Sequence, residues 1–240
     1  MPNKIDEKIK LKYLELNKAI SKMSSIEIIE WGYKEFNKEL AFTTSFGIQS
    51  AVLLDLICRS SVKNKVKIFW IDTGYLPPET YEYAEALIEK LSLNIEVLQS
   101  EMSPARMEAL YGKLWESKNI EDLDKYHQIR KVAPLEKALE KYAIKCWGSG
   151  VRAQQTENRK QMKFIEILRG RLSLRPLLGW SKKDIFYYME EKNLPQHPLF
   201  IKGYSTVGDW HSSSPENNNN KGRSTRFGGV KQECGLHINS

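Results

Sequence analysis

The sequence predicts an α/β protein with a doubly wound, mostly parallel sheet and helices on both of its faces. Short apolar runs alternate with helical segments along the first part of the chain, and this alternation is typical of parallel sheets. Two of the runs, residues 40–43 and 67–71, each end at a polar turn that leads into a helical segment. We therefore expect both strands to end at the same edge of the sheet.

Each expected element has a local signal. Ser24 and Glu27 form a capping box that begins a helix, and the apolar spacing of residues 5–20 predicts an amphipathic helix before it. The remaining segments are expected in this order: a buried helix at 48–59, a helix at 78–92, a strand at 94–98, mostly helical structure at 103–143, a strand at 143–147, a further segment at 171–176 and a helix at 181–192.

The chain is expected to form one α/β domain over residues 1–210 and a flexible C-terminal tail over residues 211–240. Residues 203–229 contain SSSPENNNNKG and few aliphatic side chains, a composition typical of surface or mobile segments. The chain nevertheless ends with the compact string KQECGLH, followed by three residues.

Composition excludes several classes of protein. The 240 residues are 41% hydrophobic, which is enough for a core, and no run approaches the roughly 18 apolar residues of a membrane span. Three cysteines are too few for a disulfide scaffold, and the first residues contain no apolar core of a signal peptide. We therefore expect a cytoplasmic protein without a membrane anchor.

The net charge of +7 is confined to one region of the chain. Residues 1–149 contain 22 basic and 22 acidic side chains, whereas residues 150–240 contain 15 basic and 8 acidic ones. Gly150, Arg152 and Arg159 begin this region, and planar guanidinium groups suit phosphate or sulfate, although many arginines simply lie on solvated helix faces. Nucleic acid and a phosphorylated small molecule are both open as ligands at this point.

Two polar turns follow the first two strands. Ser45, Gly47 and Ser50 precede a helix, where unpaired backbone amides and the helix dipole favour an anion. An ordinary strand-to-helix turn has equal weight, and no Walker lysine follows Gly47. In the second turn, Asp72 beside Gly74 could accept a hydrogen bond from a ribose hydroxyl or an amine. A turn aspartate that caps the next helix is the more ordinary interpretation.

The tail contains a candidate nucleophile. Cys234 lies near Arg223, Arg226 and His237 in the sequence, and neighbouring cations lower the pKa of a thiol and make it a competent nucleophile. A disordered tail and half of a metal site are the alternatives. No second Cys-x-x-His or Cys-x-x-Cys pair exists in the sequence, so we expect no metal site.

The other two cysteines, Cys58 and Cys146, lie in apolar segments and are expected to be inert buried thiols. Three cysteines in one chain also cannot supply the four thiolates of an iron–sulfur cluster.

Taken together, these motifs closely resemble those of the phosphoadenosine phosphosulfate (PAPS) reductases of sulfate assimilation. The resemblance covers about residues 24–238, in the family's order, and is carried by SFGIQS, IDTGYLPPETY, YGKLWE, IRKVAPLEKAL, GSGVRAQQTENR, LRPLLGWSKKDI, HPLFIKGYSTVGDWH and RFGGVKQECGLH. It implies a Rossmann-like nucleotide-binding domain similar to the adenine nucleotide alpha hydrolases and ATP pyrophosphatases, with the catalytic cysteine in the tail.

The resemblance also implies a reaction. Members of the family reduce PAPS to sulfite and adenosine 3′,5′-bisphosphate with electrons from thioredoxin or glutaredoxin, and they are commonly homodimers. Cys234 matches their nucleophile, which attacks the sulfate sulfur and becomes S-sulfocysteine. The implied substrate-binding residues are Ser45, Gly47 and Ser50 of the modified phosphate loop, Lys131, the arginine motif Arg152 and Arg159 (with Ala153 where relatives often have a second arginine), and Arg223, Arg226 and His237 of the tail.

One related family differs at four positions. Adenosine phosphosulfate (APS) reductases share the ECGLH tail, but most bind a four-iron cluster through two pairs of cysteines. In this sequence the four places are taken by Tyr126, His127, Asp209 and Ser212. The resemblance therefore implies the cluster-free branch that uses PAPS.

Three alternatives stay open. They are a cluster-free APS reductase, an adenylating enzyme of the ATP-pyrophosphatase type that would not need Cys234, and a nucleic-acid-binding protein. The last ranks lowest, because the basic region lacks dense Lys/Arg runs and stacking aromatic side chains.

Overall fold

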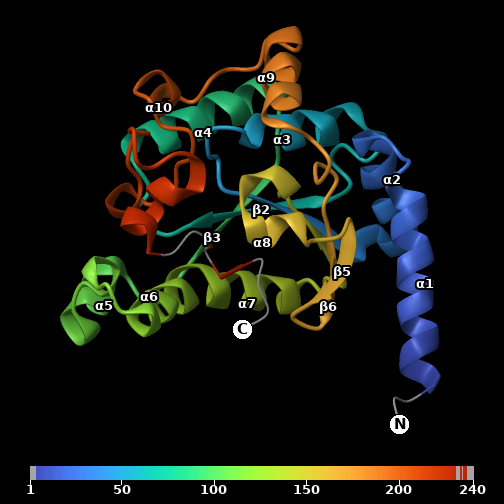
Figure 1. Cartoon of the computed structure of the whole chain (residues 1–240), viewed down its shortest axis with the longest axis horizontal. Coiled ribbons are helices and arrows are strands. Elements are labelled where there is room, and N and C mark those ends of the chain that lie inside the picture. The colour runs from blue at the N-terminus through green and yellow to red at the C-terminus, as the bar shows by residue number, and fades with distance from the viewer. Residues whose placement is uncertain (1–3, 231–232, 234, 237–240) are drawn as a thin grey trace.

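The computed structural model describes residues 4–230, 233, 235 and 236, with side chains from residue 12 onward. A six-stranded sheet of order β3-β2-β1-β4-β6-β5 forms its centre (Figure 1). The strands are β1 (Leu40–Thr44), β2 (Lys67–Asp72), β3 (Ile95–Gln99), β4 (Cys146–Gly148), β5 (Ile165–Leu168) and β6 (Arg171–Leu174). All neighbouring pairs are parallel except β5 and β6, which are antiparallel.

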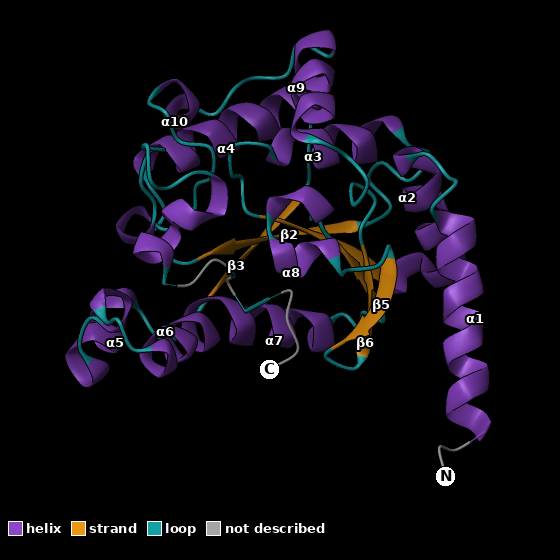
Figure 2. Cartoon of the chain, viewed as in Figure 1, coloured by secondary structure: helices purple, strands orange, loops and turns teal. Residues whose placement is uncertain are grey.

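Helices cover both faces of the sheet (Figure 2). One layer contains α2 (Ser25–Phe36), α3 (Ser50–Arg59), α4 (Pro78–Leu91) and α9 (Lys182–Glu191). On the opposite face lies α7 (Ala133–Lys141), with α5 (Pro104–Tyr111) and α6 (Ile120–His127) beside it. The predicted doubly wound α/β architecture is therefore confirmed.

Alternate residues of the central strands pack into the two hydrophobic cores, one on each face of the sheet. Phe42 and Trp70 pack with the α2, α3, α4 and α9 layer, whereas their neighbours Ala41 and Phe69 pack with α7. Successive side chains of a strand point to opposite faces, so a strand covered on both sides must be apolar throughout. This explains why the first two strands appear in the sequence as continuous apolar runs.

The remaining elements lie at the edges of this sandwich. Helix α1 (Lys4–Ile20) packs beside β5, where the Asn17 side chain pairs with both backbone groups of Ile165 at 2.9 and 3.0 Å. A π-helical turn (Gln128–Val132) joins α6 to α7. The other short described elements are α8 (Glu157–Lys160), α10 (Pro198–Ile201) and 3₁₀ turns at Asn37–Glu39, Leu114–Glu116, Ala153–Gln155, Trp210–Ser212 and Gly222–Gly229, the last interrupted by non-helical backbone at 226–228.

Local signals predicted most elements, and strand β5 was missed. The predicted capping box is confirmed, because Ser24 N–H donates to Glu27 Oε2 at 2.7 Å and Glu27 N–H donates to Ser24 Oγ at 3.3 Å. Strand β5 pairs with β6 through a two-residue turn at Arg169 and Gly170, whose φ values are +53° and +70°. Two positive φ angles define the tight hairpin turn that suits twisted strands, so the Arg-Gly pair between two apolar runs was the available signal.

The segment after α10 is not confined to the surface. Asp209, Ser212, Thr225 and Arg226 are all buried. Ser212 Oγ accepts from Arg226 Nη2 at 2.7 Å and donates to the Asp209 carbonyl at 3.2 Å, and Trp210 N–H donates to Tyr75 O at 2.7 Å. Side chains from both sides of the expected domain boundary at residue 210 thus lie in one buried region, although few of them are aliphatic. Mobility of the tail stays a prediction.

Among the described helices, none is both long and apolar enough to cross a membrane.

Candidate functional site

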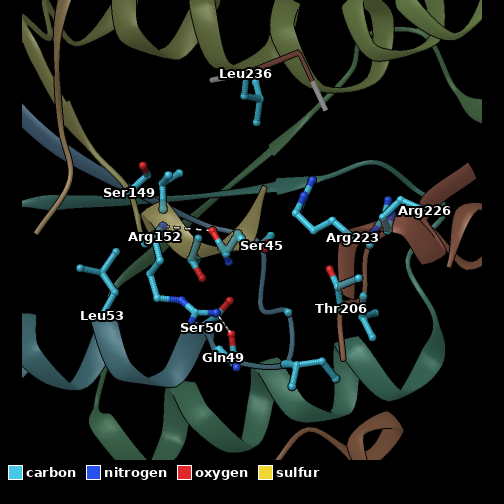
Figure 3. Close-up of a pocket in the computed structure, with 18 of the residues that line it drawn as sticks. Ser45, Gln49, Ser50, Leu53, Ser149, Arg152, Thr206, Arg223, Arg226 and Leu236 are labelled. Carbon is cyan, nitrogen blue, oxygen red and sulfur yellow. Dashed lines mark hydrogen bonds between the residues drawn. The ribbon is translucent and has the colours of Figure 1, made fainter. Parts of the chain in front are cut away.

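A cavity of about 330 Å³ lies where strands β1 and β4 end. The sheet winds outward in one direction through β1, β2 and β3 and in the other through β4, β6 and β5, so its winding reverses between β1 and β4. Ligands of doubly wound sheets bind at such a reversal, outside the carboxyl ends of the strands. Residues from the turns after β1 and β4, and from segments 205–209 and 222–226, line the cavity (Figure 3).

The turn after β1 forms an anion cradle. Ser45, Gly47 and Ser50 all line the cavity. Phe46 has a left-handed backbone (φ +44°) and is held there by its buried ring, whose centroid lies 4.8 Å from that of Trp70. Among the described residues, no side chain caps the N-terminus of α3, whereas serines cap α2 and α9. Ser50 N–H, the first amide of α3, donates to Gly47 O at 3.0 Å. The amides that follow it in the first turn are left open to an anion, which the helix dipole also favours.

The turn after β4 brings a buried cation to this cradle. The Arg152 side chain donates to Gln49 Oε1 at the start of α3 (Figure 3), and only 5% of the residue is exposed. Burial, with the charge of Arg159, lowers the pKa of Arg152 to about 10, so it remains a cation at neutral pH. No carboxylate in the described part of the chain lies within ion-pair distance of Arg152. The buried Ser149 hydroxyl, also on the wall, has no hydrogen-bond partner among the described residues.

Lys131 lies on the cavity wall in a buried ion pair. Its Nζ is 2.6 Å from Asp209 Oδ2, and Thr73 Oγ1 donates to Asp209 Oδ1 at 2.5 Å. Burial by itself would raise the pKa of Asp209, but the charges of Lys131 and Arg226 outweigh it and hold that pKa well below its usual range. The carboxylate thus links the end of β2, the π-helical turn and the segment after α10.

Arg226 lies flat against the chain at Gly208. A β-carbon at position 208 would lie 2.0–2.5 Å from the guanidinium atoms of Arg226, so a side chain here would displace the arginine. Arg226 also donates to Ser212 Oγ, as described above, and lines the cavity. The close packing against glycine fixes this second buried arginine on the cavity wall.

Arg159 pairs with Glu233, the residue before Cys234. Its Nη2 lies 2.7 Å from Glu233 Oε2, and Arg223 Nη2 lies 3.9 Å from the same oxygen. Burial by itself would raise the pKa of Glu233, but the hydrogen bonds and charge of Arg159 hold it below the usual range. Arg159 and Arg223 both line the cavity, and so does Leu236, which points toward it from the side opposite Gln49 (Figure 3).

The four positions that match cluster ligands in APS reductases are used for other contacts. Tyr126 Oη lies 3.0 Å from His211 Nε2, and His211 stacks on Trp115 with ring centroids 4.4 Å apart. The Asp209 and Ser212 contacts have been described above, and His127 is buried beside Phe227. Burial, with the nearby cations, lowers the pKa of His211 to about 4, so this histidine is neutral at pH 7. Within the described residues, no cluster of His, Cys, Asp and Glu has a geometry suited to a metal ion.

The structure brings most of the predicted residues together. Ser45, Gly47, Ser50, Lys131, Gly150, Arg152, Arg159, Arg223 and Arg226 all line the cavity. Asp72 and Gly74 do not. The Asp72 carboxylate accepts from Gly74 N–H, Tyr81 Oη and Gln99 Nε2 at 2.7–2.8 Å, so it stabilises the turn after β2. Contrary to the turn interpretation, it does not cap the next helix, because Pro77 is the N-cap of α4 and no side chain of the described residues caps that helix. Cys234 and His237 lie outside the described residues.

The two other cysteines lie away from the cavity wall. Cys146 is fully buried in β4, and burial raises the pKa of its thiol well above the usual value. Cys58 is half-buried on α3 and donates to Leu91 O at 3.6 Å, and burial raises its pKa as well. Neither environment favours a thiolate, as expected.

Sequence reasoning missed three residues of the site. Asp209, Glu233 and Gln49 have no local motif that marks them as partners of Lys131, Arg159 and Arg152. Each of the three lies at least 74 residues from its partner, so no signal in the sequence could have found these pairs.

Comparison with known proteins agrees with the resemblance. The family model described as phosphoadenosine phosphosulfate reductase domain matches residues 39–215. A relative from Synechococcus sp., named phosphoadenosine 5′-phosphosulfate reductase, is 51% identical over 225 residues, which cover 93% of this chain and 96% of the relative. A relative of the same name from Synechocystis sp. is 44% identical over 230 residues, which cover 95% of this chain and 92% of the relative.

Solved structures show the same fold. A Candida auris phosphoadenylyl-sulfate (PAPS) reductase, crystallised as a phosphate complex, superposes with a TM-score of 0.71 at 26% identity, covering 83% of this chain and 95% of that one. The FMN adenylyltransferase of Candida glabrata superposes with a TM-score of 0.59 at 17% identity, covering 85% of this chain and 66% of that one, which supports the fold alone.

Proposed function

The chain belongs to the phosphoadenosine phosphosulfate reductase family, and from this membership we propose that its cavity binds PAPS and that Cys234 attacks the bound sulfuryl group. The enzyme is an oxidoreductase that reduces PAPS to sulfite in sulfate assimilation. The observation that carries the assignment of the site is Arg152, a buried cation without a carboxylate partner among the described residues, next to the uncapped start of α3.

The cavity suits a small, strongly anionic nucleotide. Its volume of about 330 Å³ lies within the range of small-molecule sites. Its wall combines backbone amides, the hydroxyls of Ser45 and Ser50, and several guanidinium groups. Such fixed donors can neutralise the oxygens that shield a sulfate sulfur, and they need no rearrangement during the reaction.

The proposed reaction uses Cys234 as its thiolate nucleophile. The Cys234 thiolate attacks sulfur, a sulfur–sulfur bond forms, and the bond from sulfur to the bridging phosphate oxygen breaks. Adenosine 3′,5′-bisphosphate leaves with the electron pair of that bond, and the enzyme holds S-sulfocysteine. A dithiol protein, thioredoxin or glutaredoxin, then attacks Cys234 Sγ and sulfite leaves. The second thiol of the dithiol restores the Cys234 thiolate, and the reductant ends as a disulfide.

Residues on both sides of Cys234 support this assignment. The Glu233 side chain pairs with a cavity-lining arginine, and Leu236 is part of the wall. His237 follows in the sequence, and we propose that it contacts the transferred sulfuryl group. A free thiol and a dithiol reductant both require a reducing compartment, which supports a cytoplasmic location. Family membership supports a homodimer without a resident metal or cofactor.

The test is release of sulfite from PAPS with thioredoxin. We expect Cys234→Ser to lose sulfite release by more than a hundredfold, because a serine hydroxyl is a poor nucleophile at neutral pH. The variant should still bind adenosine 3′,5′-bisphosphate. Cys58→Ser is the matched control and should keep wild-type activity.

The same assay separates the remaining alternatives. With PAPS alone, the wild-type peptide that contains Cys234 should gain the mass of one sulfonate. Faster turnover of APS than of PAPS would identify a cluster-free APS reductase instead. Full activity of Cys234→Ser would end the proposed mechanism.

A further inference from the structure

Glu233 is a buried carboxylate that accepts hydrogen bonds from one short helical region. Arg159 Nε donates to both carboxylate oxygens at 3.0 and 3.1 Å, and Arg159 Nη2 donates to Oε2 at 2.7 Å. Thr156 Oγ1 donates to Oε1 at 2.8 Å. Only 5% of the Arg159 side chain and 7% of the Glu233 side chain are exposed. Glu233 thus binds α8 and the residue before it.

A second anchor lies immediately after Cys234. The Arg169 side chain, from the turn between β5 and β6, donates through Nη2 to the Gly235 carbonyl at 2.6 Å. Leu236 packs against the apolar cluster that contains Trp147 and Leu168. The residues that flank position 234 are therefore held by two separate parts of the fold.

The Glu233 contact changes the expected role of Arg159. Arg159 also donates to Gln155 Oε1, so donors on Nε, Nη1 and Nη2 are all used by protein groups. Its positive charge is compensated by a buried carboxylate, whereas Arg152 has no such partner among the described residues. An arginine in this state holds the chain in place more readily than it binds a ligand anion.

We propose that Glu233 is a positioning residue: its pairing with Arg159 and Thr156 seats the C-terminal segment so that Cys234 can be sulfonated by the bound nucleotide. The proposal rests on the proposed function of Cys234 as nucleophile. A thiol must be held close to the sulfur in a defined orientation, and small displacements reduce rates strongly. Breaking a buried ion pair by removing one partner leaves the other charge uncompensated.

The test measures sulfonation in a single turnover, by the mass of the peptide that contains Cys234 after mixing enzyme with PAPS. We expect Glu233→Gln to slow sulfonation by at least about tenfold. Its affinity for adenosine 3′,5′-bisphosphate should be equal or higher, because Arg159 then adds an uncompensated positive charge to the cavity wall. In steady state, kcat should fall while KM does not rise.

A matched control and a double variant sharpen the test. Glu157→Gln removes an exposed carboxylate on the same helix, paired with Lys160, and should react as wild type. Thr156→Val removes the hydrogen bond to Glu233 Oε1 and the cap on Arg159 N–H, but it leaves the ion pair in place and should slow sulfonation less than Glu233→Gln does. The variant Glu233→Gln/Arg159→Gln should be slowed by less than the product of the two single effects, because neither charge is left alone. Melting temperatures should show that all variants are folded.

The outcomes distinguish the two proposals. Wild-type enzyme that gains no sulfonate on Cys234 would contradict the proposed function itself. Wild-type enzyme that is sulfonated, together with Glu233→Gln at the wild-type rate, would overturn the positioning role alone. A parallel loss of nucleotide affinity in Glu233→Gln would also overturn it, since the carboxylate would then support the cavity wall rather than the nucleophile.

Discussion

At the scale of single residues, the site depends on buried charges whose partners lie far away in the sequence. Asp209 is fully buried and accepts from Lys131 and Thr73. The cost of burying a carboxylate is offset only because a cation and a hydroxyl donor meet it directly. Lys131 therefore reaches the cavity wall in a fixed orientation rather than as a flexible surface lysine.

Removing either partner of this pair should destabilise the fold. We expect Asp209→Asn and Lys131→Met each to lower the free energy of unfolding by about 3–5 kcal/mol, because each leaves an uncompensated buried group. The double variant should lose less than the sum of the two single losses. Urea unfolding at pH 7 measures all three, and strictly additive losses would show that the ion pair is not coupled.

At the scale of secondary-structure elements, the cavity exists because the turns after β1 and β4 meet at one edge of the sheet. Strand β4 must lie close to β1 for the Arg152 turn to reach the start of α3. Gly148, the last residue of β4, allows this approach, since a β-carbon there would lie 2.3 Å from the buried ring of Phe42 in β1. The two cradle-forming turns are thus brought together by backbone packing inside the sheet.

Gly148→Ala should therefore be destabilising. The Phe42 ring is fully buried and has little space in which to move, so we expect a loss of about 1–3 kcal/mol in the free energy of unfolding. Gly179→Ala is the control, since its β-carbon would meet only Phe164 at an ordinary 3.8 Å. Chemical denaturation compares the two, and equal stabilities would refute the packing argument.

At the scale of the whole molecule, buried neutral histidines make stability depend on pH. His197 is fully buried, and its Nδ1 accepts from Leu199 N–H at 3.1 Å, so its proton lies on Nε2, 3.1 Å from Thr80 Oγ1. The histidine joins α10 to α4. Burial lowers its pKa to about 4, and burial also lowers the pKa of His211 to about 4.

Acid should weaken the fold because the unfolded chain protonates His197 more readily than the folded chain does. His197 takes up a proton near pH 6.5 in the unfolded state, but only near pH 4 in the folded state. Its neutral form therefore contributes its full stabilisation above about pH 6.5, and this contribution is lost as the pH falls toward 4. Between pH 7 and pH 5 we expect wild type to lose about 2 kcal/mol more than His197→Asn, which keeps an acceptor for Leu199 but does not titrate. Urea unfolding at the two pH values measures this difference. If wild type and His197→Asn lost the same free energy of unfolding between pH 7 and pH 5, His197 would not be the group responsible.

Much of the fold could be predicted because its signals are local. The apolar runs of β1 and β2, the Ser24 cap and the polar turns at Ser45–Ser50 lie within a few residues of one another. Residues of the cavity wall could be predicted where they lie in a motif that the chain shares with the reductase family, as Arg152 and Lys131 do. Strand β5 was missed although the Arg-Gly pair of its turn is visible in the sequence. Asp72 was listed as a binding residue although a role in the turn was the more ordinary interpretation of its local sequence.

The sequence by itself determined the α/β class, the family, the identity of the candidate nucleophile and most cations of the site. Only the tertiary structure decided which of those cations are compensated. Asp209 lies 78 residues from Lys131, and Glu233 lies 74 residues from Arg159, so no local pattern connects them. Formal charges can be counted along a chain, but the electrostatic effect of a charge depends on burial and on what lies within a few ångströms. That is why two arginines of equal formal charge differ in the folded chain: Arg152 has no carboxylate partner among the described residues, whereas Arg159 is held by the residue before Cys234.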